Sequence, residues 1–158
     1  MKITLNPNAK DVATRDALVA EGGFGKYYTD HMVMCEWSEK DGWGEPHLMP
    51  YGPISLDPAT AVFHYGQEIF EGMKAYRQPD GSIALFRPTA NAKRFANSAK
   101  RLALPEMPVE LFMETVEALV KQDSGWVPSK VGESLYIRPF MIATEVGLGV
   151  RPTNKASY

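Results

Sequence analysis

The chain has 158 residues, of which 44% are hydrophobic and 23% charged, and this composition fits one globular domain with its own core rather than a disordered chain. Seventeen basic and nineteen acidic residues give a net charge of 17 − 19 = −2, with the signs interspersed, so we expect no nucleic acid and no membrane as a partner. No apolar run approaches the roughly 20 residues that span a bilayer. Asp11 and Asp16 also stand where a signal peptide would be apolar, so we expect a cytoplasmic location.

The single cysteine is Cys35, so no disulfide can form within the chain, which suits a reducing compartment. A catalytic thiol needs a general base beside it, and the sequence identifies none for Cys35. We therefore expect Cys35 to be a small packing residue.

Residues 1–23 are predicted to be a lead-in segment with at most a short helical patch, which Gly22 and Gly23 end. Aromatic and apolar residues then accumulate between turn residues, a pattern that is typical of strands. The strands predicted from this pattern lie at 26–37, near 47–51 and at 62–65, with turns at 41–44 and 56–59.

A hairpin is predicted where the apolar runs 73–76 and 83–86 are separated by the letters RQPDGS. Pro79 presets φ, Asp80 favours the turn, and Gly81 supplies a positive φ.

Two helices are predicted next, one after Pro88 that ends before Pro105 and one from Pro108 to near Gly125. Apolar residues recur at spacings of three and four in both, which predicts one buried face on each helix. The predicted core positions are Ala92, Phe95, Ala96, Ala99, Leu102 and Ala103 in the first helix and Phe112, Val116, Leu119 and Val120 in the second.

A last strand is predicted at 134–144, with Tyr136, Arg138 and Phe140 on one face. Strands in runs and hairpins with two helices between them indicate an α+β fold with a mostly antiparallel sheet.

Several chemistries are disfavoured by spacing. The Gly147–Leu148–Gly149 run lacks the third glycine of a dinucleotide site. His31, Cys35 and His47 lack the paired short spacings of a zinc site, so we expect no metal. Glu68 and Glu71 could be paired carboxylates for acid–base catalysis, but an exposed helical turn is the favoured interpretation.

One polar stripe suggests anion binding. Arg94, Ser98 and Arg101 share a helix face beside the apolar one, and a guanidinium there can hold a phosphate bidentately. A solvated basic face explains the same pattern. Tyr136 and Arg138 could likewise bind the carboxylate of a ligand, or Arg138 could only form an ion pair with a neighbouring acidic side chain.

Five separated segments carry a family resemblance. They read FGKYYTDHMVMCEW from Phe24, HYGQEIFEGMKAYR from His64, LFRPTANAKRFANSAKRLALP from Leu85, SLYIRPF from Ser134 and TEVGLGVRPT from Thr144. In this order they resemble the N-terminal part of branched-chain amino acid aminotransferases, fold type IV enzymes that depend on pyridoxal 5'-phosphate. The resemblance implies the small α+β domain of that fold over residues 24–158, with branched-chain amino acids and 2-oxo acids as substrates and a homodimer as the assembly.

The resemblance also implies roles for individual residues. Arg94 matches the arginine that binds the cofactor phosphate, whereas Arg101 has no such match. The residues that match the family's substrate pocket are Phe24, Tyr65, Phe70, Tyr136 and Arg138, together with Leu148 and Val150 of a loop that reaches the neighbouring subunit's site in the family dimer.

The family's catalytic lysine, which carries the cofactor as a Schiff base, has no match among the lysines of this chain, and no catalytic residue is assigned. We therefore expect a small domain truncated before the catalytic large domain, inactive when isolated and having that large domain as its missing partner. Two alternatives stay open. One is a fragment of another fold type IV enzyme, a D-amino acid aminotransferase or an aminodeoxychorismate lyase, although YIRP and GLGVRP weigh against both. The other is a noncatalytic dimerisation module.

Overall fold

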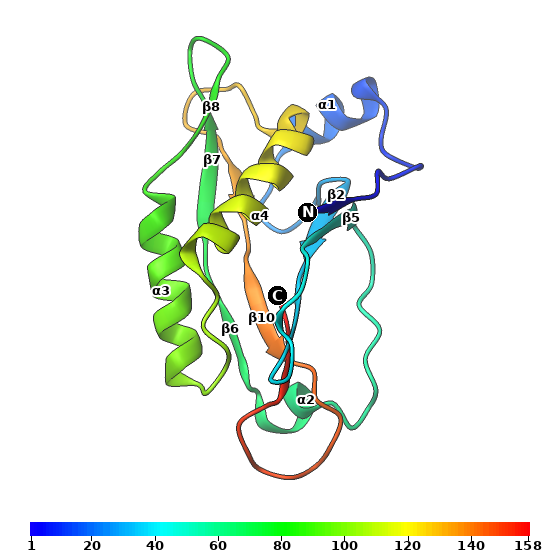
Figure 1. Cartoon of the computed structure of the whole chain (residues 1–158). Helices are drawn as coiled ribbons and strands as arrows, with labels where there is room; N and C mark the ends of the chain where they lie inside the picture. Colours follow the sequence, from blue (N-terminus) through cyan, green and yellow to red (C-terminus); the bar gives the residue numbers. More distant parts are fainter.

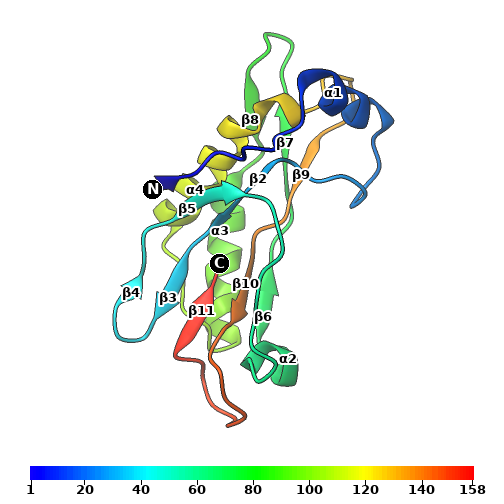
Figure 2. The same ribbon diagram turned by 90° about the vertical axis from the view of Figure 1, so that its right-hand side faces the viewer.

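The computed structural model describes residues 1–158, and its strands form a bent layer with α3 (Pro88–Arg101) and α4 (Val109–Gln122) along one face (Figures 1 and 2). Helix α1 (Val12–Glu21) lies at one end of the molecule and α2 (Ala61–Tyr65) at the other. The predicted α+β fold is confirmed. No helix is long and apolar enough to cross a bilayer.

The strands form three sheets, with the orders β1-β5-β2, β4-β3-β11-β10-β6 and β8-β7-β9. Three strands continue almost directly from one sheet into the next: β2 into β3, β6 into β7, and β9 into β10. The pairings are antiparallel except between β1 and β5. The bounds are β1 Lys2–Ile3, β2 His31–Met34, β3 Glu36–Ser38, β4 Gly42–Trp43, β5 His47–Pro50, β6 Glu68–Phe70, β7 Met73–Arg77, β8 Ile83–Leu85, β9 Leu135–Ile137, β10 Phe140–Ala143 and β11 Lys155–Ser157; a short 3₁₀ turn, Ser124–Trp126, follows α4.

The predicted hairpin is confirmed. β7 and β8 pair with Ala75 opposite Leu85 and Arg77 opposite Ile83. Gly81 has a φ of 85° in the connecting turn, which is the conformation expected of glycine there.

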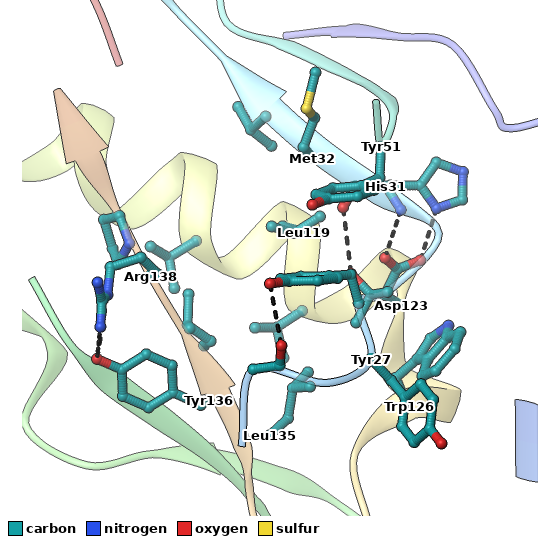
Figure 3. Close-up of a pocket in the computed structure, with 18 of the residues that line it drawn as sticks. Tyr27, His31, Met32, Tyr51, Leu119, Asp123, Trp126, Leu135, Tyr136 and Arg138 are labelled. Atoms are coloured by element: carbon teal, nitrogen blue, oxygen red, sulfur yellow. Dashed lines mark hydrogen bonds and ion pairs between the residues drawn. The ribbon is translucent and has the colours of Figure 1, made fainter. Parts of the chain in front are cut away.

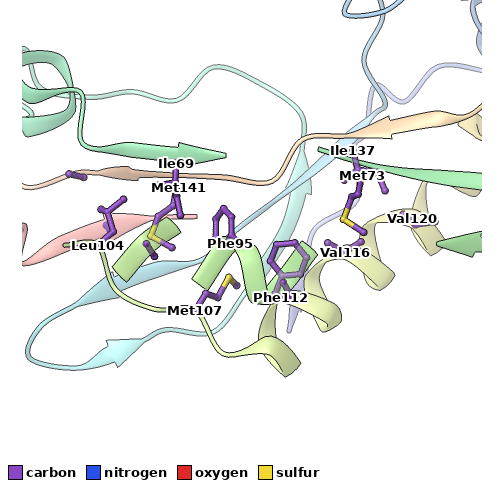
Figure 4. Packing of buried hydrophobic residues seen from close by; sticks show 14 of the residues in the cluster. Ile69, Met73, Phe95, Leu104, Met107, Phe112, Val116, Val120, Ile137 and Met141 are labelled. Carbon is purple, nitrogen blue, oxygen red and sulfur yellow. The ribbon is translucent and has the colours of Figure 1, made fainter. Parts of the chain in front are cut away.

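The core fills the space between the two helices and the strands (Figure 4). Phe95 of α3 and Phe112 of α4 are fully buried, with ring centroids 5.4 Å apart. They pack with Met141 of β10, which is also fully buried. The predicted helix faces are therefore largely right, but Leu102 and Ala103 are exposed because α3 ends at Arg101.

Several sequence predictions need correction. Residues 62–65 belong to α2 and not to a strand, because Gly66 adopts a left-handed conformation and donates its N–H to the carbonyl of Val62, which closes a helical turn. The strand expected at 26–37 begins only at His31. Pro139, which has no N–H, interrupts the strand expected at 134–144.

Residues 1–23 are tied to the rest of the chain. Helix α1 has ten residues, more than the short patch expected, and Gly22 follows its last residue. The backbone N–H of Asn6 donates to Nε2 of His31, so the His31 proton lies on Nδ1 and is donated to Asp123 at 2.7 Å (Figure 3). Both His31 and Asp123 are buried. The division into a lead-in segment and a domain from residue 24 stays a prediction.

The candidate metal ligands have other partners. His47 shares a hydrogen bond with Thr4, and no cluster of three ligand-type side chains occurs. Cys35 is 1% exposed, as expected of a packing residue, and burial together with nearby acidic groups raises the pKa of its thiol to about 11.

Two strand edges border a groove of about 1190 Å³. One side is the free edge of β2 and the other is the free edge of β9 with the start of β10, while α4 forms the floor. β11 closes one end, because it is already paired with both β3 and β10. Phe24, Tyr136 and Arg138 lie in the wall of this groove.

Candidate functional site

Tyr136 and Arg138 form the centre of the site. They lie two residues apart on an extended segment, so both side chains project to the same face. Nε and Nη2 of Arg138 donate to Oη of Tyr136 at 3.3 and 3.0 Å (Figure 3). No carboxylate pairs with Arg138, and its remaining guanidinium donors are free for an anionic ligand.

Phe70 and Phe24 pack against this pair. The guanidinium carbon of Arg138 lies 4.4 Å from the centroid of the Phe70 ring, a cation–π contact. Phe24 meets Tyr136 edge to face, with the ring centroids 4.9 Å apart. Phe24 and Phe70 are both largely exposed, so their rings form an apolar surface beside a cation.

Gly72 makes the close packing of Tyr136 possible. A Cβ atom at Gly72 would lie 3.1 Å from Cζ of Tyr136 and would overlap its Oη, so the tyrosine could not keep its place. The φ of Gly72 is not positive, so space rather than backbone conformation demands glycine there. Gly72 and Phe70 alternate with Glu71 along the strand, which places Glu71 on the opposite face.

Tyr65, Leu148 and Val150 form a second group. The Tyr65 hydroxyl at the end of α2 donates to the carbonyl oxygen of Leu148. The base of this loop is held by an ion pair between Glu145 and Arg151. Val150 is 85% exposed, and no hydrogen bond joins this group to Tyr136 and Arg138.

Arg94 is held by a buried carboxylate. Nε of Arg94 donates to Oε1 of Glu71 at 2.8 Å and Nη2 donates to Oε2 at 2.7 Å. The Arg94 side chain is 65% exposed, whereas that of Glu71 is 8% exposed. Burial by itself raises the pKa of Glu71, but hydrogen bonds from Arg94 and Asn91 and the charge of Arg94 outweigh it and hold that pKa below its usual value.

The donors of Arg94 fit a phosphate group. A guanidinium has five N–H donors, and Glu71 uses two of them. Nη1 and the second hydrogen of Nη2 point away from Glu71 into solvent, where a phosphate could accept both. Ser98 is half-buried and Arg101 is exposed on the same stripe, and neither contacts Glu71.

The sequence prediction was wrong about the burial and the local structure of Glu71. Glu68 lies in β6 and Glu71 directly follows it, so the two do not form an exposed helical turn. The signal was present in the letters EIFEGM, because Ile69, Glu71 and Met73 alternate and all three are buried on one face.

The chain resembles known proteins both in sequence and in structure. No protein-family model matches the chain. Over 156 residues it is 58% identical to the probable branched-chain-amino-acid aminotransferase of Streptomyces coelicolor, covering 97% of this chain and 43% of the relative. It is 55% identical to the branched-chain-amino-acid aminotransferase of Mycolicibacterium smegmatis, again covering 43% of that protein. The chain thus spans less than half the length of these curated relatives and corresponds to their N-terminal part.

Solved structures agree with the similarity found by sequence. The T.th. branched-chain amino acid aminotransferase, complexed with N-(5'-phosphopyridoxyl)-L-glutamate, aligns with a TM-score of 0.56 and 26% identity over 78% of this chain and 39% of that one. The Escherichia coli enzyme aligns with a TM-score of 0.57 at 23% identity, which supports the fold. By sequence identity over nearly its whole length and by fold, the chain belongs to the branched-chain amino acid aminotransferase family.

Proposed function

We propose that this chain is the part of a branched-chain L-amino acid:2-oxoglutarate aminotransferase that holds the cofactor phosphate and one side of the substrate pocket. The observation that carries the proposal is the cluster of Phe24, Phe70, Tyr136 and Arg138, which combines a free cation with aromatic walls. An amino acid with a branched apolar side chain needs both features, one for its carboxylate and one for its side chain.

Each residue has a distinct task. Arg138, with Tyr136 against it, binds and orients the substrate carboxylate. Phe24 and Phe70 contact the side chain, where each buried methylene contributes about 0.8 kcal/mol, and they keep water away from it. Arg94 holds the phosphate of pyridoxal 5'-phosphate. When bound, that cofactor supplies the electron sink for amino-group transfer.

The assembly and location are part of the same proposal. Leu148 and Val150 are exposed on a loop that Tyr65 and the Glu145–Arg151 ion pair hold in place. We place this loop at the neighbouring subunit's site in a homodimer, with Tyr65 lining the pocket from its own side. A cytoplasmic location agrees with Cys35, a single buried thiol.

The phosphate role is tested by titrating the ¹⁵N-labelled chain with pyridoxal 5'-phosphate and, separately, with pyridoxal. We expect the phosphate ester to shift the Arg94 side-chain signal and pyridoxal to leave it in place. Arg94→Ala should abolish the binding, and Arg101→Ala, on the same exposed stripe, should not. Equal binding by the Arg94→Ala chain would refute the phosphate role.

The substrate role is tested with 4-methylvaleric acid, which is bound in a solved structure of the T.th. enzyme. We expect this branched carboxylate to perturb Tyr136 and Phe70, and Arg138→Leu to remove the effect. Acetate offers the same charge without the branched chain and should bind more weakly. Perturbation that survives Arg138→Leu would contradict the assignment.

Catalysis by the isolated chain is not expected, because no lysine matches the one that carries the cofactor in the family. Purified chain, assayed with leucine and 2-oxoglutarate, should form no glutamate. Turnover at the level of an intact enzyme would overturn this expectation.

A second candidate function is a noncatalytic association module. The observation that favours it is the groove with the free edges of β2 and β9, since such edges are templates for another strand. Light scattering across a concentration series distinguishes the two, because a strict monomer at high concentration would exclude association through these edges.

A further inference from the structure

Glu71 is surrounded by donors. Its Oε1 accepts from Nε of Arg94 and its Oε2 accepts from Nη2 of Arg94. Oε2 also accepts from Nδ2 of Asn91 at 2.9 Å and from the N–H of Gly72 at 3.3 Å. Asn91 also donates to the carbonyl oxygen of Gly72 at 3.1 Å, which ties α3 to the link between β6 and β7. The carboxylate therefore has a fixed position and orientation.

The pair is unequal in burial, and this decides which residue positions the other. A buried carboxylate cannot move without losing its hydrogen bonds, whereas a largely exposed arginine otherwise samples many rotamers. Contact through Nε and Nη2 also fixes the plane of the guanidinium, because these two N–H groups can donate to both oxygens of one carboxylate in only one orientation. Nη1 is left without a hydrogen-bond partner.

We propose that Glu71 is a positioning residue that presents Arg94 to the cofactor phosphate, an inference that rests on the phosphate role of Arg94 proposed above. It assigns to Glu71 no part in proton transfer. Both carboxylate oxygens are occupied by donors, and the side chain projects to the face opposite Phe70 and Gly72.

Electrostatics and positioning predict opposite changes in the affinity for phosphate when the charge of Glu71 is removed. Removing the negative charge of Glu71 raises the local positive charge, which by Coulomb attraction would strengthen phosphate binding. Loss of positioning would weaken it, because Arg94 would be free to leave the orientation that binds. Glu71→Gln therefore distinguishes the two effects by the sign of the change in affinity.

The experiment uses the 158-residue chain, ¹⁵N-labelled, with pyridoxal 5'-phosphate as the probe. We expect Glu71→Gln to raise the dissociation constant roughly tenfold, the size of effect that orienting groups have on bound ions. The Arg94 Nε–H signal should also exchange faster with water than in the unaltered chain, before any ligand is added. Glu68→Gln, which removes an exposed carboxylate three residues earlier in β6, is the matched control and should change neither quantity.

A second variant, at Arg94, distinguishes loss of positioning from a general effect of Glu71→Gln on the fold. Arg94→Lys retains the positive charge but cannot form the forked contact, so it should also bind the probe more weakly. In the Arg94→Lys background, Glu71→Gln should cause no further loss of affinity, because the interaction that positions the guanidinium is already gone.

The outcomes separate this inference from the proposed function. Unchanged or tighter binding by Glu71→Gln, with binding still lost in Arg94→Ala, would overturn the positioning role and leave the phosphate role intact. Full binding by Arg94→Ala would overturn both. Weaker binding by Glu71→Gln and faster exchange at Arg94 support the inference.

Discussion

At the scale of single residues, the site depends on contacts between residues far apart in sequence. The α3 helix periodicity was sufficient to predict that Arg94 lies beside an apolar face. It did not reveal the buried partner, because Glu71 lies 23 positions earlier, in the link between β6 and β7. Local patterns report which face a residue occupies, whereas a partner on another element depends on how the elements pack.

The Glu71 carboxylate should make stability depend on pH. Its folded pKa lies below the ordinary value of 4.5, so the ionised form stabilises the fold above that value, and the stabilisation is lost as pH falls through the folded pKa. We expect Glu71→Gln to lower the free energy of unfolding near roughly pH 6, with a difference that shrinks towards roughly pH 3. Urea unfolding at several pH values measures this. A difference that stays constant with pH would mean that folding does not lower the pKa of Glu71.

At the scale of elements, prediction succeeded where the signal was local. The β7–β8 hairpin follows from Pro79, Asp80 and Gly81, and α3 and α4 follow from their spacing. It failed at α2, whose five residues are too few to establish a period and whose helical turn is closed by Gly66. It also missed the attachment of the segment before α1, where the backbone N–H of Asn6 donates to His31, whose buried partner Asp123 lies 92 residues further along the chain.

Asp123, at the C-terminal end of α4, should be essential to that attachment. It accepts from both the backbone N–H and Nδ1 of His31, and nothing else satisfies these buried donors. Asp123→Ala should lower the free energy of unfolding by about 3 kcal/mol. Urea unfolding measures the change, and Glu117→Ala, exposed on the same helix, should stay within about 0.5 kcal/mol of the unaltered chain. Similar losses in both variants would contradict a structural role for the pair.

At the scale of the whole molecule, three strands cross between sheets and leave a gap in the layer. β11 pairs with both β3 and β10, but β2 and β9, the strands that precede β3 and β10 in the chain, have free edges further along the groove. The sequence predicted the strands and the fold class but not this arrangement, because strand order depends on pairing between distant segments. The family resemblance, in contrast, came from five short segments, which can be recognised in the sequence without knowledge of the strand order.

The groove edges should be visible in amide hydrogen exchange. The alternation of the antiparallel ladders directs the N–H groups of Val33 and Arg138 into the groove and those of Met32 and Met141 to paired neighbours. We expect the amide hydrogens of Val33 and Arg138 to exchange roughly 100-fold faster than those of Met32 and Met141. Equal protection would indicate that another strand occupies the groove in solution, and dilution would then show whether a second copy supplies it.

Gly72 has a consequence for how this site can evolve. Because the space that a Cβ would need is filled by the Tyr136 hydroxyl, positions 72 and 136 cannot drift independently. A side chain gained at position 72 would push the Tyr136 hydroxyl out of its place, and with it the acceptor for Nε and Nη2 of Arg138. The absence of one methyl group thus constrains the arrangement of Tyr136 and Arg138, even though the glycine contributes no side chain of its own to this surface.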